Sequence, residues 1–312
     1  MKSNLWIRVL VAAAVFGIAG CTQERKETPT KGNLIMVVDE AIAPLMEKER
    51  SQFEQLYVQA HIQSDTAQAR AALVKFFDID TVKLVAISRP LNAEEREVAK
   101  RTKLDFAEYK VALNAVAIIV NNDNKVDSLR TTQLDSIYTG LANKWNAYGW
   151  TNPVVPIEVC LPNQNSMAFE VVAVKVLNGA KYAAPAAIEN SSNDMINFVA
   201  NHSGALGMVS IDCLAGSTDR VKVLRLNDPF APDTLGEKGV YYSPHQAYIY
   251  QHYYPLTTEV YLYSKADMYS VAAGLITFIT SYPGQQIAVN SGLAPATMPV
   301  RLVETTQKEI QQ

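Results

Sequence analysis

Three short polar segments of this sequence carry side chains suited to holding a small anion. Asp39-Glu40-Ala41 follows one apolar run, Ser88-Arg89 follows a second, and Asn163-Gln164-Asn165-Ser166 follows a third. An arginine offers two parallel charge-assisted hydrogen bonds to an oxyanion, and the neighbouring serine adds a hydroxyl. Asn165 and Ser166 can donate hydrogen bonds from the start of a helix. The residue types therefore indicate a site for a tetrahedral oxyanion.

Each polar segment lies between an apolar run typical of a buried strand and a predicted helix. The runs are Leu34 to Val38, Val82 to Ile87 and Pro156 to Cys160, and helices are predicted over Glu40 to Val58 and Ser166 to Leu177. Strands alternate with helices along the chain, which predicts an α/β fold with mostly parallel sheets. In such sheets ligands bind at the carboxyl ends of strands, against helix N-termini. We therefore expect the three loops to meet at one site.

Two less regular stretches also yield predictions. A helix is expected to open at Asp65-Thr66, after a short strand around His61, and one strand is expected from Val221 to Leu226. Many tyrosines lie between Tyr241 and Tyr263. They could anchor an interface with a partner protein, or they could occupy alternate, core-facing positions of the strands in this segment.

Composition excludes several classes of protein. The chain has 312 residues, 48% of them hydrophobic, and 28 basic against 31 acidic residues give a net charge of −3. A chain that binds nucleic acid by neutralising phosphates carries a basic surplus, and a disordered chain carries few apolar residues. Four scattered histidines show no metal-ligand spacing, so neither a metal nor a cofactor is expected. The length predicts two domains.

The amino terminus is typical of an exported lipoprotein. Lys2 and Arg8 precede an apolar stretch from Val9 to Ala19, and Cys21 ends a segment that resembles a bacterial lipobox, Ile18-Ala19-Gly20-Cys21. We expect a signal peptide over residues 1–20, a tether over 21–32 and a lipid on Cys21 that anchors the protein to a bacterial membrane, facing the periplasm or the cell exterior. The alternative is a secreted protein with a coincidental cysteine.

Two cysteines remain after the predicted lipid site. An exported compartment permits a disulfide between Cys160 and Cys213, but the sequence does not place them together, so a bridge and two free thiols both remain open.

Several segments in a fixed order resemble the phosphate-binding proteins of bacterial ABC transporters, the PstS family. The most specific are residues 86–90 (Ala-Ile-Ser-Arg-Pro) and 112–121 (Ala-Leu-Asn-Ala-Val-Ala-Ile-Ile-Val-Asn). Residues 133–140 with 143–145, residues 204–210 and 254–256, and residues 283–286 and 291–295 continue the resemblance over nearly the whole mature chain.

The resemblance implies a two-lobed periplasmic-binding-protein fold of type II with the ligand in the cleft. It implies a first lobe of residues 33–115 plus 246–312 and a second lobe of residues 116–245. It also implies a monomer that captures phosphate for an ABC permease or another membrane partner. Family binding residues correspond to three groups of positions: Asp39, Glu40 and Ala41; Ser88 and Arg89; and Asn163, Asn165 and Ser166.

Two of the three family elements differ in this chain. Asp39-Glu40-Ala41 stands where small hydroxyl residues are usual, and Asn163-Gln164-Asn165 replaces a Ser-Gly-Thr turn. Two like charges 4 Å apart repel by ~4 kcal/mol at an effective dielectric constant of 20, so a charged Glu40 facing phosphate would weaken binding. A carboxylate of Asp39 or Glu40 could instead accept a hydrogen bond from a protonated oxyanion. A plain helix N-terminal acid, favoured by the helix dipole, is the other interpretation.

Two other functions are alternatives to phosphate transport. A hydrolase would need a base near a nucleophilic serine, and the sequence has neither a Gly-x-Ser-x-Gly elbow nor a histidine near the three loops. A receptor lipoprotein of the same fold, which binds a different small ligand and signals to a partner protein, is the stronger alternative. The tyrosines between Tyr241 and Tyr263, as anchors for a partner protein, motivate the receptor. The departures at Asp39-Glu40 and Asn163-Gln164-Asn165 motivate the different ligand.

Overall fold

The computed structural model describes residues 27–298. Its strands are β1 (Lys31–Asp39), β2 (Gln59–Ala67), β3 (Val82–Ile87), β4 (Ala107–Asn121), β5 (Ser128–Arg130), β6 (Glu158–Pro162), β7 (Ala187–Glu189), β8 (Ala205–Ser210), β9 (Val221–Val223), β10 (Arg225–Asn227), β11 (Thr257–Ser264) and β12 (Ala294–Pro295). Its α-helices are α2 (Ala43–Leu56), α3 (Ala69–Asp78), α4 (Ala93–Arg101), α5 (Thr131–Tyr138), α6 (Met167–Lys175), α7 (Ser192–Asn201), α8 (Gln246–Tyr250), α9 (Val271–Thr280) and α10 (Tyr282–Asn290). Short 3-10 helices include η1 (Glu40–Ile42) and η3 (Ile211–Leu214). The predicted signal peptide and the lipid site at Cys21 lie outside the described residues.

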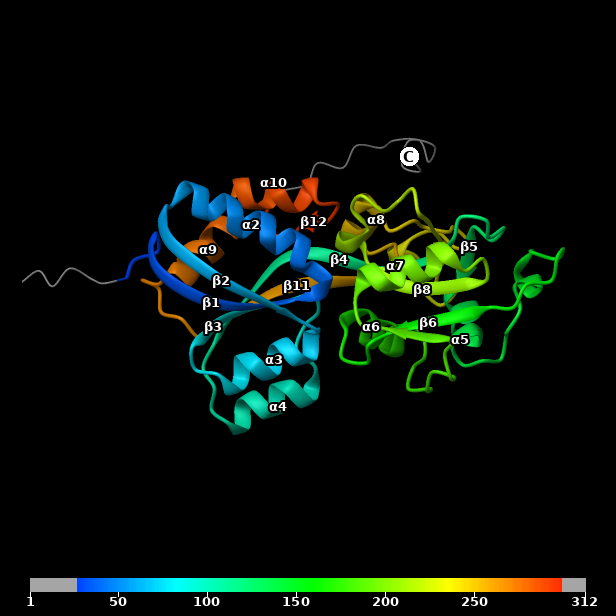
Figure 1. The fold of residues 1–312 in the computed structure, drawn as a ribbon, viewed down its shortest axis with the longest axis horizontal. Helices are drawn as coiled ribbons and strands as arrows, with labels where there is room; N and C mark the ends of the chain where they lie inside the picture. Colours follow the sequence, from blue (N-terminus) through cyan, green and yellow to red (C-terminus); the bar gives the residue numbers. More distant parts are fainter. Residues whose placement is uncertain (1–26, 299–312) are drawn as a thin grey trace, which may run out of the picture.

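One curled sheet runs through the molecule in the strand order β2-β1-β3-β11-β4-β8-β6-β7. Strand β4 passes from one half to the other, with β1, β2, β3 and β11 on one side and β6 and β8 on the other (Figure 1). We call the half that carries α2, α3, α4, α9 and α10 the first lobe, and the half that carries α5, α6 and α7 the second lobe. The two-lobed α/β architecture predicted from the sequence is thus present.

Helices cover both faces of the first-lobe sheet, which explains its unbroken apolar runs. Helices α2, α9 and α10 lie on one face, and α3 and α4 lie on the other (Figure 1). On β1, Val37 packs in the same cluster as Leu73 and Phe76 of α3, whereas Met36 and Val38 share a second cluster with α2 and α9. Alternate residues of one strand therefore enter two cores, as in sheets buried on both sides.

The prediction of mostly parallel sheets is wrong around the crossing between the lobes. Strand β4 is antiparallel to β8, β9, β11 and β12, and β11 is also antiparallel to β3. The reason is topological: β4 carries the chain out of the first lobe and β11 carries it back, so the two strands run in opposite directions side by side. The pairs β1–β2, β1–β3 and β6–β8 are parallel, as expected.

Two predicted boundaries also differ from the structure. The helix expected at Asp65-Thr66 begins at Ala69, because β2 stays paired with β1 until Ala67 lies opposite Asp39. The single strand expected over residues 221–226 is two strands, β9 paired with β4 and β10 paired with β5. The buried Leu224 separates them.

The two described cysteines are free thiols. Cys160 is buried on β6 and Cys213 lies in η3, so the disulfide left open by the sequence is absent from the structure. Between residues 27 and 298, no helix has both the length and the apolar character that crossing a membrane requires.

Candidate functional site

Asp39 connects the first two predicted loops by hydrogen bonds. It ends β1, and its Oδ1 accepts a hydrogen bond from the Ala41 amide at 3.2 Å. Its Oδ2 accepts from the Ser88 amide at 3.2 Å and from the Ser88 hydroxyl at 2.5 Å, because Ser88 follows the adjacent parallel strand β3. The side chain is completely buried, and burial raises the pKa of Asp39 to about 6 although the Ser88 hydrogen bonds oppose that rise. The Ser88 hydroxyl proton is therefore directed at Asp39.

Arg89 is neutralised by two carboxylates of the protein itself. Its guanidinium donates two hydrogen bonds to Glu95, at 2.8 and 2.7 Å, and one to the Pro90 carbonyl. Its Nε lies 2.7 Å from Glu170 Oε2, in an ionic contact without the alignment of a hydrogen bond. Burial by itself would lower the pKa of Arg89, but Glu95 and Glu170 outweigh burial and raise it. Glu170 belongs to α6, so Arg89 links the two lobes.

The third predicted loop precedes α6 in the second lobe. Asn163 accepts a hydrogen bond from the Asn165 amide at 2.9 Å and donates one to the Asn190 side chain at 3.0 Å. Ser166 caps α6 by accepting from the Phe169 amide. The side chains of this loop thus shape the entry to a helix N-terminus, where backbone amides and the helix dipole favour an anion.

Glu40 reaches from the first lobe to the N-terminus of α7 in the second. Its two carboxylate oxygens accept hydrogen bonds from the Ser192 amide and the Ser192 hydroxyl, each at 2.9 Å. The next residue, Ala41, is buried beside it. A carboxylate of the chain therefore occupies a position at which a helix N-terminus attracts an anion.

The lobes meet directly around a small cavity. Its volume is about 20 Å³, which is room for about one water molecule. Four of the eight predicted residues line it, namely Glu40, Ala41, Asn163 and Ser166, and so do Gln68, Asn190, Ser191 and Ser192. Asp39, Ser88, Arg89 and Asn165 do not line the cavity.

Backbone and amide contacts also cross between the lobes beside this cavity. The Gln68 side chain donates a hydrogen bond to the Asn190 carbonyl at 2.8 Å. The Arg70 amide donates to the Asn165 carbonyl at 3.1 Å. Together with the Glu40–Ser192 and Arg89–Glu170 contacts, these bonds hold the cleft closed.

Several residues of this cleft were not predicted from the sequence. Asn190-Ser191-Ser192 has the same strand, polar loop and helix order as the predicted loops, but β7 before it has only three residues, so no apolar run marks it. No sequence pattern identifies Glu170 or Asp212 as part of the cleft. Glu170 contacts Arg89, and Asp212 accepts a hydrogen bond from the Leu45 amide; both partners are distant in the sequence. Within residues 27–298, no group of histidine, cysteine and carboxylate side chains is arranged to hold a metal ion.

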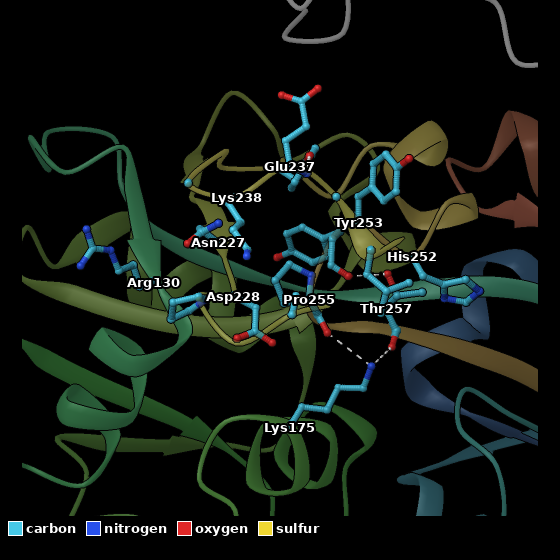
Figure 2. A pocket seen from close by; sticks show the side chains of 17 residues that line it. Arg130, Lys175, Asn227, Asp228, Glu237, Lys238, His252, Tyr253, Pro255 and Thr257 are labelled. Atoms are coloured by element: carbon cyan, nitrogen blue, oxygen red, sulfur yellow. Dashed lines mark hydrogen bonds between the residues drawn. The ribbon is translucent and has the colours of Figure 1, made fainter. Parts of the chain in front are cut away.

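A larger cavity, of about 570 Å³, lies at the other end of α6 (Figure 2). Lys175, the last residue of α6, donates hydrogen bonds to the carbonyls of Pro255 at 3.3 Å and Thr257 at 2.6 Å. Tyr242, Tyr253 and Tyr254 line the same cavity, and none of the eight predicted residues does.

Comparisons with known proteins agree with this geometry. A family profile described as the PBP superfamily domain matches residues 23–282. The phosphate-binding protein PstS of Staphylococcus aureus strain USA300 is 25% identical over 225 residues, which are 71% of this chain and 65% of that protein. The chain thus spans somewhat less than two thirds of this relative's length.

Two solved structures share the fold. A substrate-binding protein of Clostridium perfringens with bound phosphate has a TM-score of 0.71 and 20% identity, covering 85% of this chain and all of that one. An ABC-type phosphate transport receptor from Vibrio cholerae has a TM-score of 0.64 and 20% identity over the same shares. The resemblance stated from the sequence and the two-lobed fold are confirmed.

Proposed function

Because this chain belongs to the family described as the PBP superfamily domain, and is a divergent member of the PstS group, we propose that it is an extracytoplasmic solute-binding protein. It captures inorganic phosphate between its lobes and delivers it to an ABC permease. We propose that the first lobe comprises residues 33–115 and 246–312 and the second residues 116–245, in a monomer without enzymatic activity.

The observation that carries this proposal is the convergence of three helix N-termini on one cavity. The segments that begin η1, α6 and α7 all line it, and each follows the carboxyl end of a strand. Backbone amides and serine hydroxyls at helix N-termini bind oxyanions without a metal. Phosphate would enter when the lobes separate and would be enclosed when they close.

The export and anchoring of the protein are part of the same proposal. Residues 1–20 act as a signal peptide, and Cys21 carries a lipid that anchors the protein to a bacterial membrane. The tether expected over residues 21–32 ends before β1, because Lys31 and Gly32 pair with Gln59 and Ala60 of β2. Labelled fatty acid should be incorporated into the wild-type protein and not into Cys21→Ser. Equal labelling of both proteins would contradict the anchor.

The binding proposal is tested by calorimetric titration of phosphate into protein refolded free of ligand, with sulfate as the control anion. At about 100 times its dissociation constant, phosphate would add ~2.7 kcal/mol to the free energy of unfolding. We expect heat and a raised melting temperature with phosphate and neither with sulfate. Absence of both with phosphate would contradict the proposal.

A second candidate is favoured by the charge of the cleft. Arg89 is already paired with Glu95 and Glu170, and Glu40 covers the N-terminus of α7. A ligand with hydroxyl or cationic groups would meet these carboxylates without repulsion. In that case the protein is a receptor lipoprotein that signals to a partner, and titration with amines or polyols gives heat where phosphate gives none.

A further inference from the structure

Glu40 makes the contacts that a bound anion would make. Its carboxylate receives the Ser192 amide and the Ser192 hydroxyl, both at 2.9 Å, at the start of the ten-residue helix α7. These are charge-assisted hydrogen bonds to a helix N-terminus, the arrangement by which proteins hold oxyanions. Glu40 comes from the opposite lobe, so the same two bonds also join the lobes.

We propose that Glu40 is a tethered anion that occupies an oxyanion position of the cleft and thereby lowers the affinity of the protein for free oxyanions. This inference rests on the proposed function for its ligand class, a small oxyanion such as phosphate. It assigns Glu40 a role opposite to that of a ligand-binding residue. The carboxylate competes with the ligand, and binding requires its displacement from Ser192.

The backbone around Glu40 holds the carboxylate in this position. Asp39, completely buried, caps η1 through the Ala41 amide and fixes the direction in which Glu40 leaves β1. The Cys213 thiol, from the second lobe, contacts the carbonyl oxygens of Glu40 and Ala41 at 3.6 and 3.7 Å. Both the side chain and the backbone of Glu40 therefore contact the second lobe.

A second carboxylate makes the reciprocal contact. Asp212, which follows β8, accepts a hydrogen bond from the Leu45 amide in the first turn of α2 at 2.9 Å. Asp212 is completely buried, and its Oδ1 has no hydrogen-bond partner. Each lobe thus places a carboxylate on a helix N-terminus of the other, and these two contacts join the lobes.

The cavity is too small to hold an oxyanion beside the Glu40 carboxylate, so the two must compete. With Glu40 in place the cavity holds about 20 Å³, room for one water and not for a tetrahedral oxyanion. A ligand at the N-terminus of α7 must take the Ser192 amide and hydroxyl from Glu40. Because two charge-assisted hydrogen bonds are exchanged and a like charge is removed, loss of the carboxylate should strengthen oxyanion binding at least ~10-fold.

The test compares the full chain with Glu40→Ala and the isosteric Glu40→Gln. Glu97→Gln, which removes a carboxylate from the exposed side of α4 in the same lobe, is the matched control. Inorganic phosphate is titrated calorimetrically, and hydrogen exchange is followed for the peptide that contains Ser192. We expect a phosphate dissociation constant at least ~10-fold lower in Glu40→Ala than in the wild type, an intermediate value in Glu40→Gln and no change in Glu97→Gln.

Hydrogen exchange separates this inference from the proposed function. Without ligand, the Ser192 amide should exchange at least ~10-fold faster in Glu40→Ala than in the wild type, whatever the ligand of the cleft is. If phosphate binds to no variant while exchange increases in this way, phosphate is the wrong ligand and the tethered anion stands. Unchanged exchange in both Glu40 variants would overturn the inference. So would measurable phosphate binding to the wild type together with equal or weaker binding to Glu40→Ala.

Discussion

Replacing Glu49 with glutamine should stabilise the protein increasingly as the pH rises from 5 to 8. Glu49 lies on the buried face of α2, between Leu45 and Phe53, and is 1% exposed. Neither of its carboxylate oxygens has a hydrogen-bond partner. A buried carboxyl group without a partner is held in its neutral form, because desolvation penalises the charge.

The size of the effect follows from the pKa of Glu49. Burial raises this pKa from 4.5 to about 8. Between these values the carboxyl group is protonated in the folded state and ionised in the unfolded state, so the unfolded state binds fewer protons and stability falls as the pH rises. Each pH unit costs about 1.4 kcal/mol, which amounts to roughly 3 kcal/mol between pH 4.5 and 7, and the loss levels off above about pH 8.

The assay is urea denaturation of the wild type and Glu49→Gln at several pH values. Glutamine keeps the shape and cannot ionise, so the part of the decline that Glu49 causes should be absent from the variant. Asp39 and Asp212, whose pKa values burial also raises to about 6, are present in both proteins and cancel in the comparison. Glu47→Gln, at an exposed position of the same helix, is the control. Parallel stability curves for the wild type and Glu49→Gln from pH 5 to 8 would refute the reasoning.

Three further predictions follow from the same contacts. Arg89→Leu should destabilise the protein by ~3–5 kcal/mol in urea denaturation, because it leaves Glu95 buried without its cation, and a loss below 1 kcal/mol would contradict that role. Denatured, unreduced protein should show both Cys160 and Cys213 as titratable thiols, whereas the native Cys160 thiol should stay unreactive at pH 8, since burial raises its pKa to about 12. Gly204→Ala should lower the melting temperature by several degrees, because its Cβ would lie 2.3 Å from a backbone carbonyl oxygen, and an unchanged melting temperature would contradict the close approach.

The part of the cleft that follows from local pattern could be predicted. Apolar runs before Asp39 and Ser88 identify β1 and β3, and adjacent parallel strands bring the ends of both runs together. The Asp39–Ser88 hydrogen bonds are the result. The loop at Asn163 is recognisable for the same reason, since it separates β6 from α6.

The partners of these residues could not be predicted, because they depend on how the lobes dock. Ser192 is 152 residues from Glu40, and the interaction that directs the carboxylate there is formed only when the cleft closes. The pairing of Arg89 with Glu170 has the same origin. An arginine that the sequence suggests for an anion therefore binds carboxylates of its own chain in this closed structure.

The most direct test of the central claim is a crystal structure of the protein grown with phosphate, refined for the position of the anion. We predict phosphate between the lobes at the N-termini of α6 and α7, in contact with Ser192, with the Glu40 carboxylate moved away from it. Phosphate bound elsewhere, or an unchanged Glu40–Ser192 contact in a cleft without phosphate, would contradict the claim that this cleft is the solute-binding site.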